Sequence, residues 1–229
     1  MAIDVWLIAL DVAPTEIAAL APLLDEEERT QAERFRHAQD RTRFIARRGR
    51  LRQLLATYLG RPPAFDRNAY GKPSVRGGGD LRFNVSHSDG LALCVVGEVE
   101  LGCDIERRNP ALADPDVAER LFAPGEWRCF AALPEDQRIE GFFNCWTRKE
   151  AFIKAIGLGV SHPLDSFEVS LAPGDTPALL GGGEGWSIAS FEAAPGYQAA
   201  LVTAGDAASS MTPPRRFSGD AARVAPGES

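Results

Sequence analysis

The chain has 229 residues, room for one large domain or two small lobes, and 45% of them are hydrophobic and 25% charged, as in an ordinary globular protein. With 25 Lys and Arg against 32 Asp and Glu, the net charge of −7 argues against a general nucleic-acid binder, because phosphate binding relies on basic residues. No apolar run approaches the roughly 20 residues that cross a bilayer, and the start does not resemble a secretory signal. The four cysteines form no CxxC pair. We therefore expect a cytoplasmic protein with reduced thiols that binds neither nucleic acid nor membrane.

The first half of the chain predicts both strands and helices. Residues 3–10 alternate as a strand does, and apolar positions from Phe44 to Tyr58 fall on one helical face. The acidic run at 25–28 favours a helix start, because the positive end of the helix dipole attracts anions. Further strands are predicted at 81–85, 91–96 and 99–105, with Gly97-Glu98 as a tight hairpin turn between the last two.

The second half predicts a similar mixture, which makes the fold class α+β. Helices are expected at 117–122, 125–133 and 139–156, and strands at 164–171 and 186–204. The end of the chain from residue 207 is rich in Ala, Ser, Pro and Gly, so we expect a flexible tail there. The boundary between the halves falls most naturally near 102–110.

Two carboxylates stand two residues apart in a predicted strand. Residues at this spacing point to the same side, so Asp104 and Glu106 face one way. Two neighbouring carboxylates repel each other unless a cation, a proton or a basic partner intervenes. The spacing is equally compatible with a solvated strand edge.

A third carboxylate lies on a predicted helix among aromatic residues. Helical spacing places Glu150 beside the apolar stripe that includes Phe143 and Trp146, and Lys154 lies one turn further on. A simple helix ion pair between Glu150 and Lys154 explains the spacing but not the aromatic surroundings. If Glu150 converges with the two strand carboxylates, the three form an oxygen site of the kind that Mg²⁺ prefers.

Two other features suit an anionic ligand. Nine arginines lie between residues 29 and 52, against two acids, Glu33 and Asp40, although a solvated helix face explains most of such a cluster. His87 follows a predicted strand, where it could bind phosphate through a ring N–H or be structural.

Several segments, in this order, resemble the 4′-phosphopantetheinyl transferases, specifically the longer two-lobed kind called Sfp-type. The matching segments are Tyr70-Gly71-Lys72-Pro73, Phe83-Asn84-Val85-Ser86-His87-Ser88, Gly102-Cys103-Asp104-Ile105-Glu106 and Trp146-Thr147-Arg148-Lys149-Glu150-Ala151-Phe152-Ile153-Lys154. The resemblance covers roughly residues 30 to 170. It implies two similar lobes related by a pseudo-twofold axis, each a small antiparallel sheet packed with helices, with the active site in the cleft between them. The lobes are expected at 1–105 and 106–206, followed by the tail at 207–229.

The resemblance also implies a reaction, a metal and a set of site residues. The family moves the 4′-phosphopantetheine arm of coenzyme A to a serine of an acyl or peptidyl carrier protein, depends on Mg²⁺ and releases adenosine 3′,5′-bisphosphate. By resemblance, the metal ligands are Asp104, Glu106 and Glu150, the catalytic residues are Glu150, Lys154 and His87, and the coenzyme A contacts are Arg43, Arg47, Lys72, Ser86, His87 and Lys154. The proton acceptor for the carrier serine is either Glu150 or a water held by the metal.

One departure from the family concerns the nucleotide. Many relatives carry a basic residue for the 3′-phosphate where this chain has Glu28 and Gln31, and Arg29, Arg34, Arg43 and Arg47 are the candidates to replace it. The expected partners are coenzyme A and a carrier protein, and we expect a monomer. The alternatives are a Mg²⁺-dependent hydrolase of a nucleotide or coenzyme A pyrophosphate, and a non-catalytic coenzyme A-binding protein.

Overall fold

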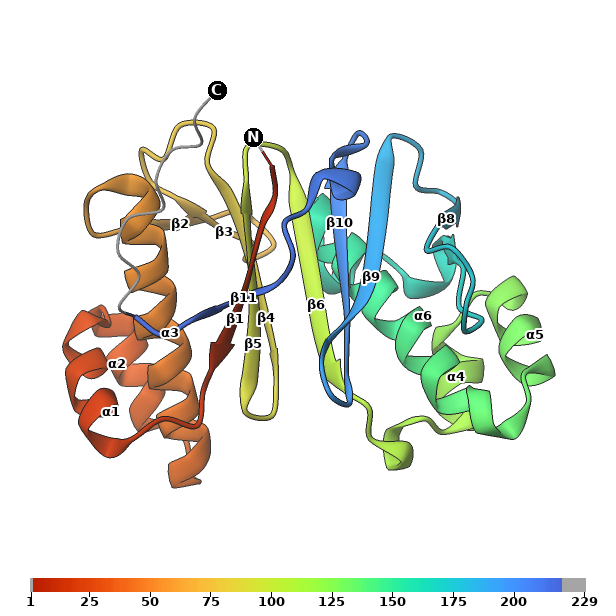
Figure 1. Cartoon of the computed structure of the whole chain (residues 1–229), viewed down its shortest axis with the longest axis horizontal. Helices are drawn as coiled ribbons and strands as arrows, with labels where there is room; N and C mark the ends of the chain where they lie inside the picture. Colours follow the sequence, from red (N-terminus) through yellow and green to blue (C-terminus); the bar gives the residue numbers. More distant parts are fainter. Residues whose placement is uncertain (1, 220–229) are drawn as a thin grey trace.

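The fold is α+β and consists of four layers (Figure 1). In the computed structural model, which describes residues 2–219 apart from the side chain of Val160, two sheets of mainly antiparallel strands face each other and helices cover their outer faces. Helices α1 to α3 pack on the first sheet, and helix α6 packs on the second. The α+β class predicted from the sequence is confirmed.

The first sheet has the strand order β11-β1-β5-β4. Strands β1 (Asp4–Ala9), β4 (Arg82–Ser88) and β5 (Leu91–Gly97) are antiparallel neighbours, and β11 (Arg215–Phe217) runs parallel to β1. Every residue of β5 is buried, because this strand lies inside the sheet with both faces covered.

Three helices cover the outer face of this sheet. They are α1 (Pro14–Leu20), α2 (Glu26–Glu33) and α3 (Ala38–Leu59), with the short 3₁₀ turn η1 (Ala21–Leu23) after α1. Helix α2 begins with a capping box, in which Asp25 accepts from the Glu28 N–H and Glu28 accepts from the Asp25 N–H. The hairpin of β2 (Phe65–Arg67) and β3 (Pro73–Val75) follows α3.

The second sheet has the strand order β6-β10-β9. Strand β10 (Tyr197–Ala204) pairs antiparallel with both β6 (Leu101–Arg107) and β9 (Trp186–Ala194). A separate two-stranded pair, β7 (Glu168–Val169) and β8 (Leu179–Gly181), lies beyond this sheet. Of the strand predicted at 164–171, the structure contains β7 only.

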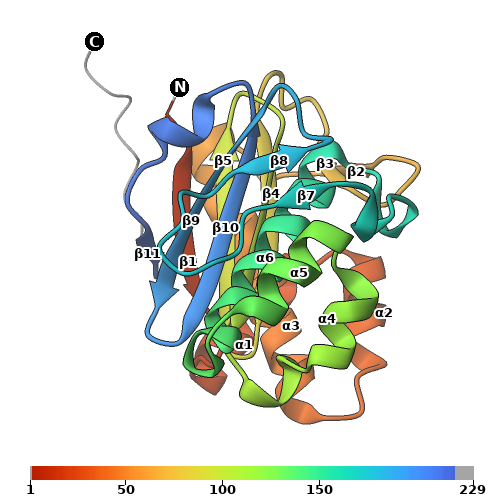
Figure 2. The same ribbon diagram turned by 90° about the vertical axis from the view of Figure 1, so that its right-hand side faces the viewer.

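Helices α4 (Pro115–Leu121), α5 (Pro124–Ala132) and α6 (Glu135–Ile156) accompany the second sheet. Figure 2 shows α6 along the face of this sheet, where it shares a buried core with Ala200 and Val202 of β10. The remaining 3₁₀ turns are η2 (Pro110–Leu112), η3 (Gly159–Ser161), η4 (Leu164–Ser166) and η5 (Ala207–Ser210).

A third core fills the space between the two sheets. Val5 and Leu7 of β1 point into it, while Trp6 and Ile8 point to the helices on the other side, as strand alternation requires. From the second sheet, Leu201 of β10 is part of this central core. The two sheets are therefore held together by buried apolar side chains.

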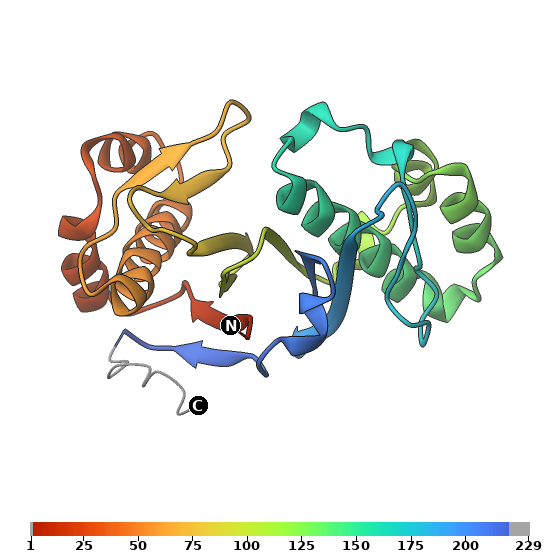
Figure 3. The same ribbon diagram turned by 90° about the horizontal axis from the view of Figure 1, so that it is seen from above.

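Two expectations about connections are wrong. The predicted hairpin at Gly97-Glu98 does not form, because both edges of β5 are taken by β1 and β4, and β6 pairs with β10 in the other sheet. The chain from residue 207 to 219 is not an unstructured tail, since it forms η5 and β11 and crosses back to the first sheet (Figure 3). Residues 220–229 of the predicted tail lie outside the described residues. The division into lobes at 105 stays a prediction, and this position falls inside β6.

Candidate active site

Asp104 and Glu106 of β6 face two serines of β4. The Ser86 hydroxyl donates to Asp104 Oδ1 over 2.7 Å, and the Ser88 hydroxyl donates to Glu106 Oε2 over 2.8 Å. The two strands are not paired by a backbone ladder, but Asn84 Oδ1 accepts from the Cys103 N–H at 3.0 Å. The two acids point to the same side of β6, as predicted, and the two serines, also two residues apart, point from β4 toward them.

Helix α6 brings Glu150 and Lys154 to these acids because it packs directly on Gly102. A β-carbon at this position would lie 2.2 Å from the Ala155 nitrogen and 2.3 Å from the Ala151 oxygen. The close approach lets Lys154 Nζ reach Asp104 Oδ1 at 2.6 Å, while Glu150 Oε2 lies 3.9 Å from the same amine.

The Lys154 amine is held as a cation. Burial acts to lower the pKa of Lys154, but the attraction and hydrogen bond of Asp104 outweigh it and the pKa is raised. The amine also donates to Ser86 Oγ at 2.9 Å. Asp104 is only 2% exposed, whereas the Lys154 side chain is 29% exposed, so the carboxylate is the buried half of this ion pair.

The carboxylates are destabilised by their surroundings. Burial raises the pKa of Glu106 and of Glu150, and the charge of Asp104 adds to both shifts. The charge of Lys154 and, for Glu106, hydrogen bonds from Ser88 and Trp146 act in the opposite direction. Asp104 Oδ2 is buried without a hydrogen-bond partner, which is costly for a carboxylate oxygen.

The three acids do not form a finished metal site in this arrangement. Within residues 2–219, leaving aside the Val160 side chain, no group of three or more His, Cys, Asp or Glu side chains is placed to hold a metal ion. The donor set nevertheless suits a hard divalent cation, since it offers carboxylates and one buried oxygen, Asp104 Oδ2, that lacks a partner.

Arg47 and His87 meet beside this group of acids. Arg47 Nη1 lies 2.7 Å from Nδ1 and 2.9 Å from Nε2 of His87. A guanidinium can only donate and a neutral imidazole has one acceptor nitrogen, so only one of the two ring nitrogens accepts a hydrogen bond from Arg47. Although part of the ring reaches solvent, desolvation and then the charges of Arg47 and Lys154 lower the pKa of His87 to about 4. Together with Arg43, both residues line a pocket of about 230 Å³.

The other two predicted coenzyme A contacts are already engaged. Arg43 makes a bidentate pair with Asp11, at 2.7 and 2.8 Å. The Lys72 amine donates to Glu100 Oε2 at 2.9 Å and to the Ala155 carbonyl at 2.8 Å. A ligand contact by either residue stays a prediction.

Much of the arginine cluster serves the fold. Besides Arg43, three of the nine pair with acids that precede the cluster in sequence: Arg48 with Glu28, Arg50 with Glu16, and Arg52 with Asp25 and Glu28. Glu28 is 3% exposed and pairs with two of these arginines, so this acid is a buried structural group.

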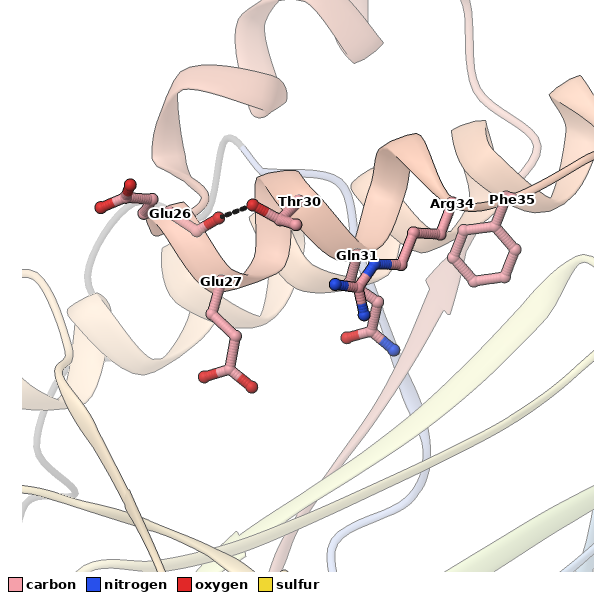
Figure 4. A pocket seen from close by; sticks show the side chains of 6 residues that line it. All are labelled: Glu26, Glu27, Thr30, Gln31, Arg34 and Phe35. Atoms are coloured by element: carbon pink, nitrogen blue, oxygen red, sulfur yellow. Dashed lines mark hydrogen bonds between the residues drawn. The ribbon is translucent and has the colours of Figure 1, made fainter.

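A pocket of about 850 Å³ lies along α2, and its lining includes Arg34, one of the arginines considered from the sequence for the 3′-phosphate. Figure 4 shows its lining side chains: Glu26, Glu27, Thr30, Gln31, Arg34 and Phe35. Phe35 also lines the pocket of Arg47 and His87, so the two pockets share a wall. Arg34 is the basic residue in this lining.

Sequence reasoning assigned no role to Ser88, Asn84 or Trp146, all of which touch β6 or its acids. The repeat of serines at 86 and 88, two residues apart like the acids, is a signal that could have identified Ser88. No local pattern indicates the contact of Asn84 with the Cys103 backbone.

None of the helices in the described part of the chain is long and apolar enough to span a membrane.

Comparison with known proteins gives consistent matches. The family model described as the 4′-phosphopantetheinyl transferase superfamily matches residues 100–202. The 4′-phosphopantetheinyl transferase HetI of Nostoc sp. (strain PCC 7120) is 37% identical over 213 residues, which cover 89% of this chain and 88% of that protein. The 4′-phosphopantetheinyl transferase Sfp of Bacillus subtilis (strain 168) is 31% identical over 186 residues, covering 79% of this chain and 82% of that protein.

A crystal structure of a holo-(acyl-carrier-protein) synthase from Bacillus anthracis str. Ames, in complex with CoA (3′,5′-ADP), is similar to part of the chain. It is 21% identical, with a TM-score of 0.41, and the match covers 47% of this chain and 96% of that chain. The family assignment rests on the sequence relatives.

Proposed function

The chain belongs to the 4′-phosphopantetheinyl transferase superfamily, and we propose that it transfers the 4′-phosphopantetheine arm of coenzyme A to a serine of an acyl or peptidyl carrier protein. The products would be the holo carrier and adenosine 3′,5′-bisphosphate. The observation that supports this proposal is the pair that Lys154 of α6 makes with Asp104 of β6, with Glu150 3.9 Å from the same amine and one buried Asp104 oxygen left without a partner. A monomeric state and a cytoplasmic location stay predictions.

We propose Mg²⁺ as the cofactor. Asp104, Glu106 and Glu150 would hold it, because carboxylate oxygens are the ligands that this ion prefers and because a cation would relieve the repulsion that Asp104 exerts on each of the two glutamates. When bound, the ion would supply positive charge to the phosphate oxygens of the substrate. The side chains must turn from their present partners to do so, since no finished site exists among the described residues.

We propose that Lys154 and His87 contact the pyrophosphate of coenzyme A. The carrier serine oxygen forms a bond to the β-phosphorus while the bond from that phosphorus to the bridging oxygen breaks. Negative charge grows on the leaving phosphate, where the Lys154 ammonium stabilises it and donates a proton. The Glu150 carboxylate accepts the proton of the serine hydroxyl.

Coenzyme A is proposed to lie between two similar lobes, each made of one sheet and its helices. Arg47 and His87 come from the first sheet-and-helix layer, and Glu150 and Lys154 from α6 on the second. The pocket along α2, which adjoins the Arg47 and His87 pocket at Phe35, has the volume to take the nucleotide part. In that position Arg34 is our candidate for the 3′-phosphate.

The test is mass spectrometry of several apo carrier proteins after incubation with coenzyme A, with Mg²⁺ or with a chelator. We expect one phosphopantetheine to be added in the presence of Mg²⁺, and the loss of this product in Glu150→Gln. Asp136→Asn, at an exposed position on the same helix, is the matched control and should retain activity. Cleavage of coenzyme A that needs no carrier would instead identify the alternative, a pyrophosphate hydrolase.

A further inference from the structure

The hairpin of β2 and β3 reaches across to the end of α6. The Asn68 Nδ2 group donates to the Gly157 carbonyl at 2.9 Å, and Lys72 Nζ donates to the Ala155 carbonyl at 2.8 Å. The last four carbonyls of a helix have no acceptor role inside the helix, so they need donors from elsewhere. Here two of these donors come from a distant part of the chain.

Asn68 also shapes the turn that carries Lys72. Its Oδ1 atom accepts from the Tyr70 N–H and the Lys72 N–H, both at 2.9 Å, and its backbone N–H donates to the Lys72 carbonyl at 3.0 Å. One side chain therefore uses its oxygen to hold the turn and its nitrogen to bond the helix end.

The contact is close because residue 157 has no side chain. Gly157 ends α6 with a φ of +70°, and a β-carbon there would lie 3.0 Å from Lys72 Cδ and 3.2 Å from Asn68 Nδ2. The Lys72 amine is additionally paired with Glu100, which also binds Arg82 at 2.8 Å. If the Lys72 amine is removed, Glu100 therefore still has Arg82 as a cationic partner.

We propose that Asn68 and Lys72 are positioning residues, which fasten the last turn of α6 and so set Lys154 against Asp104. Lys154 directly precedes Ala155, whose carbonyl accepts from Lys72. Lys72 and Lys154 also line one pocket of about 240 Å³ between the hairpin and the helix. This role rests on the proposed transfer reaction, and it differs from the direct coenzyme A contact that the sequence resemblance implies for Lys72.

The test compares three variants with a control in the same hairpin. Asn68→Asp keeps the acceptor that holds the turn and loses the donor to Gly157, Lys72→Met loses the amine, and Lys72→Arg keeps a donor. The control is Arg76→Met, because Arg76 pairs with Asp66 within the hairpin, both exposed at the surface. The measurements are amide hydrogen exchange of the full-length protein without substrate, and kcat and KM for coenzyme A with an apo carrier.

We expect Asn68→Asp and Lys72→Met to speed exchange in the last turn of α6 and to lower kcat roughly tenfold, because small displacements of a reacting group are costly, with KM within twofold of the wild type. Lys72→Arg should restore slow exchange and most of kcat, and the control should match the wild type.

A raised KM for coenzyme A in Lys72→Met, with kcat and exchange unchanged, would make Lys72 a ligand contact and overturn the proposal. Unchanged exchange in both Asn68→Asp and Lys72→Met would overturn it as well. If the wild type transfers nothing, the proposed function fails, yet the exchange data still decide whether the hairpin fastens the helix.

Discussion

The contact between α6 and β6 at Gly102 predicts the effect of Gly102→Ala. The added β-carbon would meet three backbone atoms of the helix: the Ala155 nitrogen at 2.2 Å, the Ala151 oxygen at 2.3 Å and the Lys154 carbonyl carbon at 2.7 Å. Backbone atoms cannot rotate away as a side chain can. Since ordinary contact begins at 3.4 Å, the helix must move back by about 1.2 Å.

This displacement affects stability and activity together. Overpacking of a core costs about 1–3 kcal/mol, and a misplacement of about 1 Å in a catalytic group costs roughly 100-fold in rate. The assays are urea denaturation and carrier modification followed by mass spectrometry. Gly181→Ala is the control, because a β-carbon added there would have no atom within 4 Å, and this variant should behave as the wild type. A Gly102→Ala protein with wild-type stability and activity would show that α6 does not depend on this close contact.

Four further substitutions test other parts of the account. Asp104→Asn should abolish transfer and weaken Mn²⁺ binding measured by electron paramagnetic resonance; undiminished Mn²⁺ affinity would remove Asp104 from the metal site. His87 has a folded-state pKa of about 4, below its usual 6.5, so the unfolded state takes up the proton first and the free energy of unfolding should fall as the pH drops from 6.5 to 4. The denaturation midpoint of His87→Gln should fall less over this range than that of the wild type. An equal pH dependence of the two midpoints would contradict the lowered pKa of His87. Glu126→Gln breaks a 2.8 Å pair with Lys149 in which both side chains are 1% exposed, and should cost about 3–5 kcal/mol in denaturant unfolding, whereas a cost below about 1 kcal/mol would show that the pair is dispensable. Arg34→Gln should raise KM for coenzyme A but not for dephospho-coenzyme A; an equal rise for both substrates would assign Arg34 elsewhere.

Local periodicity was sufficient to predict many of the individual elements. The strand at 3–10 and the helix around Phe44 to Tyr58 are found as β1 and within α3. The pairing of strands was not accessible in the same way, because it depends on which edges are free. Strand β5 already has β1 and β4 on its two edges, so β6 pairs elsewhere despite the turn-like Gly97-Glu98.

The ordered structure of residues 207–219 likewise depends on contacts with residues far away in the sequence. Arg215 pairs with Asp4 at 2.5 Å, and its guanidinium lies 4.2 Å from the centre of the Trp6 ring. Both partners lie at the opposite end of the sequence. Composition alone indicated a flexible tail, because it carries no information on such contacts.

For the candidate site, the short-range geometry was predictable and the long-range geometry was not. Strand alternation placed Asp104 and Glu106 on one side, and helical spacing placed Lys154 near Glu150. The nearer partner of Lys154 is Asp104, 50 residues earlier, which depends on how closely α6 approaches Gly102. The acids that pair with the arginine cluster were also missed, since they lie outside its sequence window.

The most direct test of the central claim is titration of the protein with a divalent cation while carrier modification is followed. If Asp104, Glu106 and Glu150 bind one such ion next to a diphosphate, Mn²⁺ should bind with a stoichiometry of one, and phosphopantetheine should appear on the carrier as that site fills. Each single amide variant of the three acids should weaken both together. Full transfer in a chelator, or metal binding that none of these variants weakens, would contradict the account.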